Sequence, residues 1–219
     1  MTAAATVFVV DDDEAVRQSL VRLIESVGLP AEAYGGADAF LSRCQPERPG
    51  CLILDLCMPG TSGLELQERL IGNGISIPII AISGHADVEK AVRAMKNGAL
   101  DFIKKPYKAQ VLLDAIRKAL EIDAGRRRQE AGRSDVAVRL ATLTPREREV
   151  LDLLAAGNAA KEIALTLKLS RKTVDLHRRR AMAKLGVNSL ADLLRVSQIS
   201  RPDPLAVAPP LPNPPQHHS

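Results

Sequence analysis

Hydrophobic and polar positions in the first half of the chain follow two alternating patterns. Short runs of mostly β-branched or large apolar residues predict buried strands near 6–10, 31–34, 51–54, 77–82 and 100–103. Apolar residues at helical spacing predict helices near 14–27, 36–44, 63–72, 87–97 and 108–122. Because strands and helices alternate, we expect an α/β doubly wound fold, in which a five-stranded parallel sheet is covered by helices on both faces.

The pattern changes after residue 122. Residues 123–141 are polar and rich in arginine, so we expect a linker there, with a frayed continuation of the preceding helix as the alternative. Short helices are then predicted at 145–156, 159–167, 170–184 and 189–197, which indicates a small all-α domain. Thr144 begins the first of them, with Pro145 at its first position and Glu147 at the capping-box position, and Ser170 caps the third.

Composition narrows the class of protein. The 219 residues, 46% of them hydrophobic, allow two modest globular domains, and no apolar run approaches the roughly 18 residues of a membrane helix. The start has no basic signal-peptide region and the cysteines have no metal-type spacing, so we expect a cytoplasmic protein with ordinary thiols. Half of the residues from Pro202 to Pro215 are proline, which predicts a disordered tail over 200–219.

Charge is divided unevenly between the two halves. Residues 1–122 contain 13 Lys/Arg and 16 Asp/Glu, a net charge of −3, whereas residues 123–219 contain 17 and 10, a net charge of +7. The basic half is therefore a candidate for binding nucleic acid.

Carboxylates follow two of the predicted strands. Asp11 and Asp12 come directly after the first strand, and Asp55 comes directly after the third. Asp13 is expected to cap the helix that follows rather than to join them. Because ligands bind at the carboxyl edge of an open parallel sheet, these acids indicate a site for a hard cation such as Mg²⁺.

These motifs, in this order, resemble the NarL/FixJ family of two-component response regulators, with the styrene- and toluene-responsive branch nearest. Residues 6–122 are similar to a CheY-like, flavodoxin-like receiver, and residues 142–197 to a LuxR-type helix-turn-helix. The resemblance implies a receiver domain at 1–122, a linker at 123–141 and a DNA-binding domain at 142–199.

The resemblance implies a role for each receiver motif. Asp55 stands at the position of the phosphate-accepting aspartate, and Asp11 and Asp12 match the pair that binds Mg²⁺ together with Asp55 and the backbone carbonyl of Cys57. Ser83 and Phe102 occupy the positions of the switch hydroxyl and the switch aromatic, and Lys105 precedes Pro106 as the phosphoryl-binding lysine does.

The helix from Ser170 is expected to lie in the major groove of DNA. The resemblance places Asp175, Leu176 and Arg179 at the positions that read bases, and an acid there departs from the commonest pattern. Asp175 either accepts a hydrogen bond from a base or forms a surface salt bridge to Arg171 or Arg179. The candidate DNA-binding residues are Lys161, Arg171, Lys172, Asp175, Leu176, Arg178 and Arg179.

The predicted function is a phosphorylation-activated transcription regulator, not an enzyme beyond its own phosphorylation and dephosphorylation. The implied partners are a sensor histidine kinase, promoter DNA, RNA polymerase and, on phosphorylation, a second copy of the chain. We expect the two copies to meet through 87–97, 100–103 and 108–122, without a membrane partner.

Two alternatives remain open from the sequence. One is a DNA-binding regulator that works without phosphorylation. The other is a phosphatase with an aspartyl nucleophile, which is disfavoured because Cys57 stands where such enzymes carry a second acid. A dinucleotide-binding domain is disfavoured because no GxGxxG motif follows the first strand.

Overall fold

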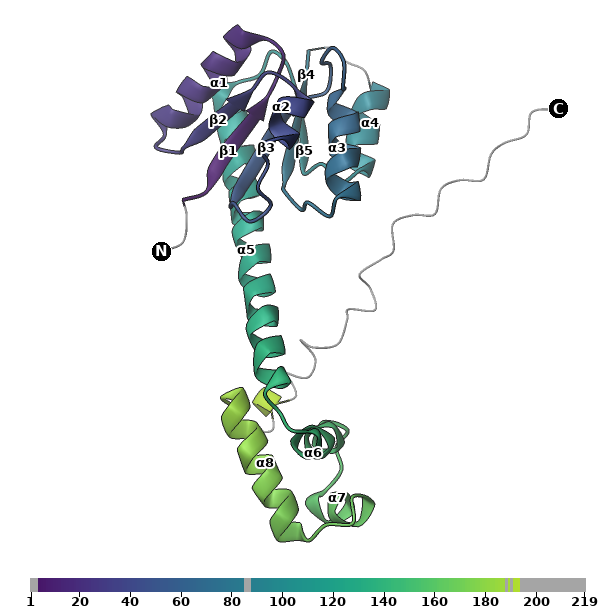
Figure 1. Cartoon of the computed structure of the whole chain (residues 1–219). Helices are drawn as coiled ribbons and strands as arrows, with labels where there is room; N and C mark the ends of the chain where they lie inside the picture. Colours follow the sequence, from purple (N-terminus) through teal and green to yellow (C-terminus); the bar gives the residue numbers. More distant parts are fainter. Residues whose placement is uncertain (1–3, 85–87, 188, 190, 194–219) are drawn as a thin grey trace, which may run out of the picture. The chain divides into compact units, whose positions relative to one another are not determined.

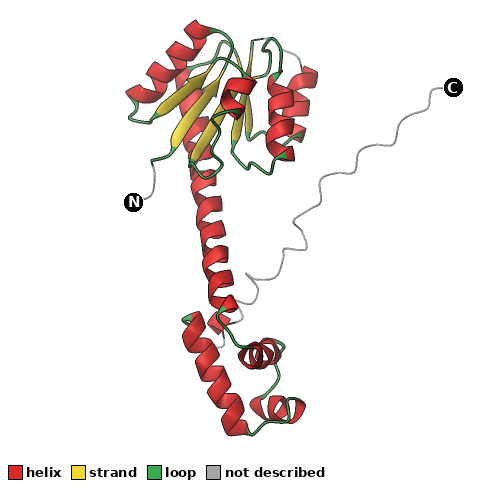
Figure 2. Ribbon diagram, viewed as in Figure 1, coloured by secondary structure: helices red, strands yellow, loops and turns green. Residues whose placement is uncertain are grey.

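The computed structural model describes residues 4–84, 88–187, 189 and 191–193. The chain divides into two compact units, Met1–Arg128 and Gln129–Ser219, which are described separately. The first unit contains a five-stranded sheet flanked by helices, and the second consists of helices (Figures 1 and 2).

The first unit confirms the predicted doubly wound fold. Its strands are β1 (Thr6–Val10), β2 (Ala31–Tyr34), β3 (Gly50–Asp55), β4 (Ile79–Ser83) and β5 (Asp101–Lys104). All neighbouring strands are parallel, in the order β2-β1-β3-β4-β5. Chain order reverses between β1 and β3, so the carboxyl ends of these two strands form the switch point at which such sheets bind ligands.

The helices of this unit are α1 (Glu14–Ser26), α2 (Ala37–Leu41), α3 (Gly63–Gly72), α4 (Val88–Lys96) and the first part of α5 (Ala109–Ala141), which continues into the second unit. Residues 85–87, which include the start of the helix predicted at 87–97, lie outside the described part. Asp13 caps α1 as predicted, since its side chain accepts hydrogen bonds from the backbone N–H groups of Ala15 and Val16.

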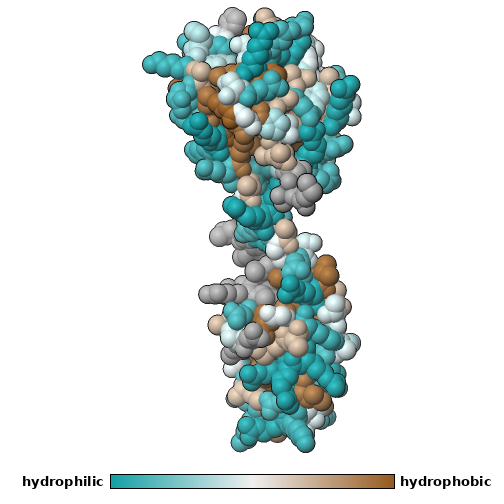
Figure 3. Space-filling view, turned by 90° about the vertical axis from the view of Figure 1, so that its left-hand side faces the viewer, coloured by the Kyte–Doolittle hydropathy of each residue, from teal (hydrophilic) through white to brown (hydrophobic). Residues whose placement is uncertain are grey.

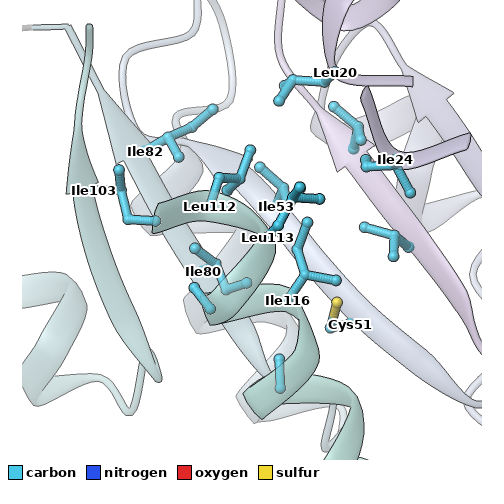
Figure 4. Close-up of a cluster of buried hydrophobic side chains, with 14 residues drawn as sticks. Leu20, Ile24, Cys51, Ile53, Ile80, Ile82, Ile103, Leu112, Leu113 and Ile116 are labelled. Atoms are coloured by element: carbon cyan, nitrogen blue, oxygen red, sulfur yellow. The ribbon is translucent and has the colours of Figure 1, made fainter. Parts of the chain in front are cut away.

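Alternation along the central strands divides the core between the two faces of the sheet. Val7, Val9, Ile53, Ile80 and Ile82 point to the face covered by α1 and α5. Figure 4 shows side chains of these two helices gathered over that face. The intervening residues, among them Phe8, Val10, Leu52 and Leu54, pack with residues of α2 and α3 on the other face. Strands buried on both faces explain the continuous apolar runs in the sequence.

Residues 123–141 follow the alternative given for this stretch, a continuation of the preceding helix, since α5 runs without interruption to Ala141. Although this stretch is polar, many of its residues have high helix propensity, among them alanine, arginine, glutamate and glutamine. Asp123 is also 1% exposed, whereas a solvated linker predicts an exposed side chain.

The second unit contains the helices α6 (Pro145–Ala155), α7 (Ala160–Thr166) and α8 (Arg171–Leu185). Thr144 and Glu147 form the predicted capping box of α6, and Ser170 caps α8. The helix predicted at 189–197 lies largely outside the described residues. Within it, the described residues 191–193 are helical. A small core joins these helices through residues such as Val150, Leu151, Ile163, Val174, Ala181 and Leu185.

Candidate functional site

Three carboxylates meet at the carboxyl edge of the sheet. Asp11 follows β1 and Asp55 ends β3, and these adjacent strands bring oxygens of Asp11, Asp12 and Asp55 within 4.8 Å of one another. Asp11 and Asp55 are buried, while Asp12 is exposed. The structure thus brings together the acids that the sequence nominated for Mg²⁺.

Lys105 lies directly after β5 and bridges two of these acids. Its Nζ donates to Oδ2 of Asp11 at 2.7 Å and to Oδ2 of Asp55 at 2.6 Å. Burial, only partly offset by the hydrogen bond from Lys105, raises the pKa of Asp11. Burial disfavours the ammonium of Lys105, but the hydrogen bonds and charges of Asp11 and Asp55 outweigh it and raise its pKa. Because one ammonium is shared by two carboxylates, the cluster keeps a net negative charge, which favours binding of a further cation.

Backbone N–H groups hold both buried carboxylates. The N–H of Cys57 donates to Oδ1 of Asp55 at 2.8 Å, and the N–H of Asp13 donates to Oδ1 of Asp11 at 2.9 Å. These bonds hold the two side chains in place beside Asp12, with which they form the acidic cluster.

Gly63, the first residue of α3, packs directly against the backbone of Asp55. A Cβ at this position would lie 2.1 Å from the carbonyl oxygen of Asp55 and 2.8 Å from Cα of Leu56. Only glycine permits this approach. Sequence reasoning missed Gly63, because a glycine at the start of a helix gives no sign of what its backbone contacts.

The two predicted switch residues lie on neighbouring strands. Ser83 ends β4 with 1% exposure, and its Oγ lies 3.4 Å from Sγ of Cys57. Phe102, on β5, is partly buried and packs on a small apolar cluster that includes Leu56, Ala81 and Ala94. Nζ of Lys90, on α4, lies 3.7 Å from the same Sγ, a contact that the sequence did not indicate. His85 lies outside the described residues.

The candidate DNA-binding residues are all exposed in the second unit. Those on α8 are Arg171, Lys172, Asp175, Leu176, Arg178 and Arg179, and Lys161 lies on α7. The opposite side of α8 is buried through Val174, Ala181 and Leu185, as its periodicity predicts. The face shown in Figure 3 is mostly hydrophilic over this unit.

Asp175 forms no ion pair with either arginine proposed for it among the described residues. Nε of Arg179 instead lies 3.4 Å from the backbone oxygen of Asp175. With Arg178 and Arg179, Asp175 lines an open hollow of about 560 Å³. Its carboxylate is therefore available to a ligand at the surface of the helix.

An ion pair between the exposed Lys184 and the buried Glu147 joins α8 to α6. Nζ of Lys184 donates to Oε2 of Glu147 at 2.7 Å and to the backbone oxygen of Thr142 at 3.1 Å. The hydrogen bond from Lys184, then that from the N–H of Thr144, lowers the pKa of Glu147 to about 2. Lys184 therefore contributes to the position of α8 within the second unit.

Comparison with known proteins agrees with this architecture. Residues 7–117 match the family described as the response regulator receiver domain, and residues 141–197 match the family described as bacterial regulatory proteins, luxR family. Nodulation protein W of Bradyrhizobium diazoefficiens is 44% identical over 194 residues, which cover 89% of this chain and 86% of that protein. The chain belongs to the response-regulator family.

Other response regulators are similar over comparable lengths. TodT of Pseudomonas putida is 41% identical over 195 residues, which cover 89% of this chain and 86% of that protein. The low-resolution structure of StyR matches with a TM-score of 0.82 and 44% identity, covering 90% of this chain and 99% of that one. Within the described part, no helix of this response regulator is both long and apolar enough to span a bilayer.

Proposed function

We propose that this response regulator accepts a phosphoryl group on Asp55 from a sensor histidine kinase and then binds promoter DNA more tightly as a dimer. The observation that carries the proposal is the arrangement around Asp55. Its carboxylate lies with Asp11 and Asp12 at one sheet edge, 2.6 Å from Nζ of Lys105.

The transfer forms one bond and breaks one. A carboxylate oxygen of Asp55 bonds to phosphorus while the bond from phosphorus to the kinase's histidine nitrogen breaks, and the nitrogen keeps the electron pair. Lys105 can exchange its carboxylate partners for a phosphoryl oxygen, since its ammonium already lies between Asp11 and Asp55. The chain catalyses at most its own phosphorylation and dephosphorylation.

The donor set fits Mg²⁺, which prefers oxygen ligands and retains water. Asp11, Asp12 and Asp55 would hold it, with the backbone carbonyl of Cys57 as a further ligand. Bound there, Mg²⁺ supplies positive charge that reduces the repulsion between a carboxylate and a phosphoryl group.

Ser83 and Phe102 form the proposed switch. The hydroxyl of Ser83 lies next to Cys57, two residues after Asp55, so a phosphoryl group on Asp55 offers it a new acceptor. Movement of Ser83 would open space into which Phe102 turns.

The proposed dimer surface comprises α4, β5 and the receiver part of α5. Large apolar side chains are exposed on these helices: Val88 (71%), Val92 (46%), Met95 (44%) and Val111 (50%). Exposed residues of this kind favour association with a second copy. On promoter DNA, the dimer would place two α8 helices on related half-sites and contact RNA polymerase.

The test of phosphorylation uses the intact protein with acetyl phosphate and Mg²⁺. We expect the mass to rise by about 80 Da, and Asp55→Asn to abolish this rise. Asp13→Asn is the matched control, because asparagine preserves the cap of α1 and Asp13 lies outside the cluster. An unmodified wild-type mass, together with unchanged DNA affinity, would favour a regulator that works without phosphorylation.

Asp175 tests the proposed base contacts. We expect Asp175→Ala to alter the preferred base at one operator position. The free energy of binding to the original sequence should become less favourable by about 1–3 kcal/mol. Selection of binding sites from random DNA measures this preference. Asp152→Ala, an exposed acid on α6, controls for the loss of charge. An unchanged selected sequence would contradict the reading role.

A further inference from the structure

A further buried carboxylate, that of Asp123, lies at the opposite edge of the receiver sheet from Asp11 and Asp55. Oδ2 of Asp123 accepts from the backbone N–H of Gly50 at 2.9 Å and from Nε of Arg127 at 2.7 Å. Oδ1 accepts from Nη2 of Arg126 at 2.6 Å. These three hydrogen bonds compensate for the burial of the Asp123 carboxylate, since an unpaired buried charge would be costly.

The guanidinium of Arg127 extends this network to the chain before β3. Nη1 donates to the backbone oxygen of Glu47 at 2.9 Å, and Nη2 donates to those of Pro46 at 2.9 Å and Arg48 at 2.7 Å. We name Asp123, Arg127, Gly50 and the carbonyls of residues 46–48 the amino-edge latch. Four of its hydrogen bonds join α5 to Gly50 and to the chain before β3, all within the first unit.

Gly50, which accepts no larger side chain, places the latch against the closely packed backbones of β1 and β3. A Cβ at this position would lie 2.0 Å from the backbone oxygen of Thr6, so only glycine fits between β1 and β3. Gly50 begins β3 and Asp55 ends it. At about 3.3 Å per residue, one strand therefore connects the latch to the proposed phosphorylation site over about 17 Å.

Beyond the latch, α5 lacks comparable support. Every residue from 128 to 135 is exposed, and Gly132 lies within this stretch. A helix without packing is marginal at such lengths, and glycine weakens it by about 1 kcal/mol relative to alanine. The latch thus determines how firmly α5 is held where it leaves the receiver.

We propose that the amino-edge latch transmits the state of the receiver to the connecting part of α5, with Asp123 and Arg127 as positioning residues. This inference rests on the proposed function, since it concerns how phosphorylation of Asp55 reaches the DNA-binding unit. Neither residue contacts the acidic cluster, so both act through the helix that they hold.

The test compares Arg127→Met with Arg128→Met. Both remove one arginine, but Arg128 is exposed and forms none of the latch contacts. The probe is a duplex selected from random DNA by the phosphorylated wild-type protein. We expect Arg127→Met to gain the phosphoryl group normally, as judged by mass. Its affinity ratio between phosphorylated and unphosphorylated protein should fall from the roughly 5- to 150-fold typical of allosteric coupling to below about twofold.

Hydrogen exchange supplies a readout that does not depend on DNA. Amides of residues 124–135 should exchange faster in Arg127→Met and at the wild-type rate in Arg128→Met. Should Arg127→Met fail to fold, Arg127→Lys keeps the positive charge near Asp123. Its three N–H donors cannot replace the four hydrogen bonds that Arg127 donates, so the same losses are expected. A wild-type affinity ratio in the latch variants would overturn the inference, whereas a wild-type protein that ignores phosphorylation would overturn the proposed function itself.

Discussion

At the scale of single residues, the site depends on charged side chains and on Gly63, which has no side chain. Asp11, Asp12, Asp55 and Lys105 could be nominated from the sequence, because acids after strands and a Lys-Pro pair are visible in it. Gly63 could not, since its importance lies in a contact with the backbone of Asp55.

Gly63 offers a sharp test of how tightly the site is packed. We expect Gly63→Ala to lower the free energy of unfolding by about 1–3 kcal/mol and to slow phosphorylation, because the added methyl group displaces the backbone of Asp55. Chemical denaturation and the rate of mass gain measure the two effects.

Gly72→Ala is the control on the same helix. A Cβ there meets no atom within 4 Å, so we expect stabilisation of up to about 1 kcal/mol from helix propensity. Equal effects of the two substitutions would show that the contact with Asp55 is unimportant.

At the scale of elements, the strands and the receiver helices follow from periodicity, whereas the length of α5 does not. Residues 123–141 have no continuous apolar stripe, so their helix depends on anchors at its ends. Asp123 and Arg127 bind the receiver, and Arg139 donates to the backbone oxygen of Leu185 in the second unit. Such long-range contacts are invisible in a local pattern.

The ion pair between Glu147 and Lys184 should make the second unit sensitive to acid. The pKa of Glu147 is lowered to about 2, so its stabilisation is complete above the unfolded value near 4.3 and is lost as pH falls toward 2. We expect Glu147→Gln to lower the free energy of unfolding by about 2 kcal/mol at pH 7. The difference should shrink progressively as the pH falls from about 4.5 to about 2.

Thermal unfolding of the full chain across this pH range measures the difference between Glu147→Gln and wild type. Glu149→Gln is the control, because Glu149 pairs with Arg146 at the surface and such pairs contribute little. A cost for Glu147→Gln that stays constant down to pH 2 would contradict the assigned ion pair.

At the scale of the whole molecule, charge is divided unevenly between the two halves of the chain. The acidic first half contains the cluster around Asp55, and the basic second half exposes its arginines on α8. Composition could not reveal that Lys184 pairs with Glu147, because this contact depends on how α6 and α8 pack. The domain boundaries assigned from the sequence remain predictions.

The sheet order of the receiver also bears on aggregation. β2 and β5 are the outermost strands, and both are only four residues long. Asp101 and Lys104 place exposed charges on β5. Short, charged outer strands are poor templates for a strand from another molecule. Self-association of the receiver is thereby directed toward contacts between side chains and away from the open-ended growth that leads to fibrils.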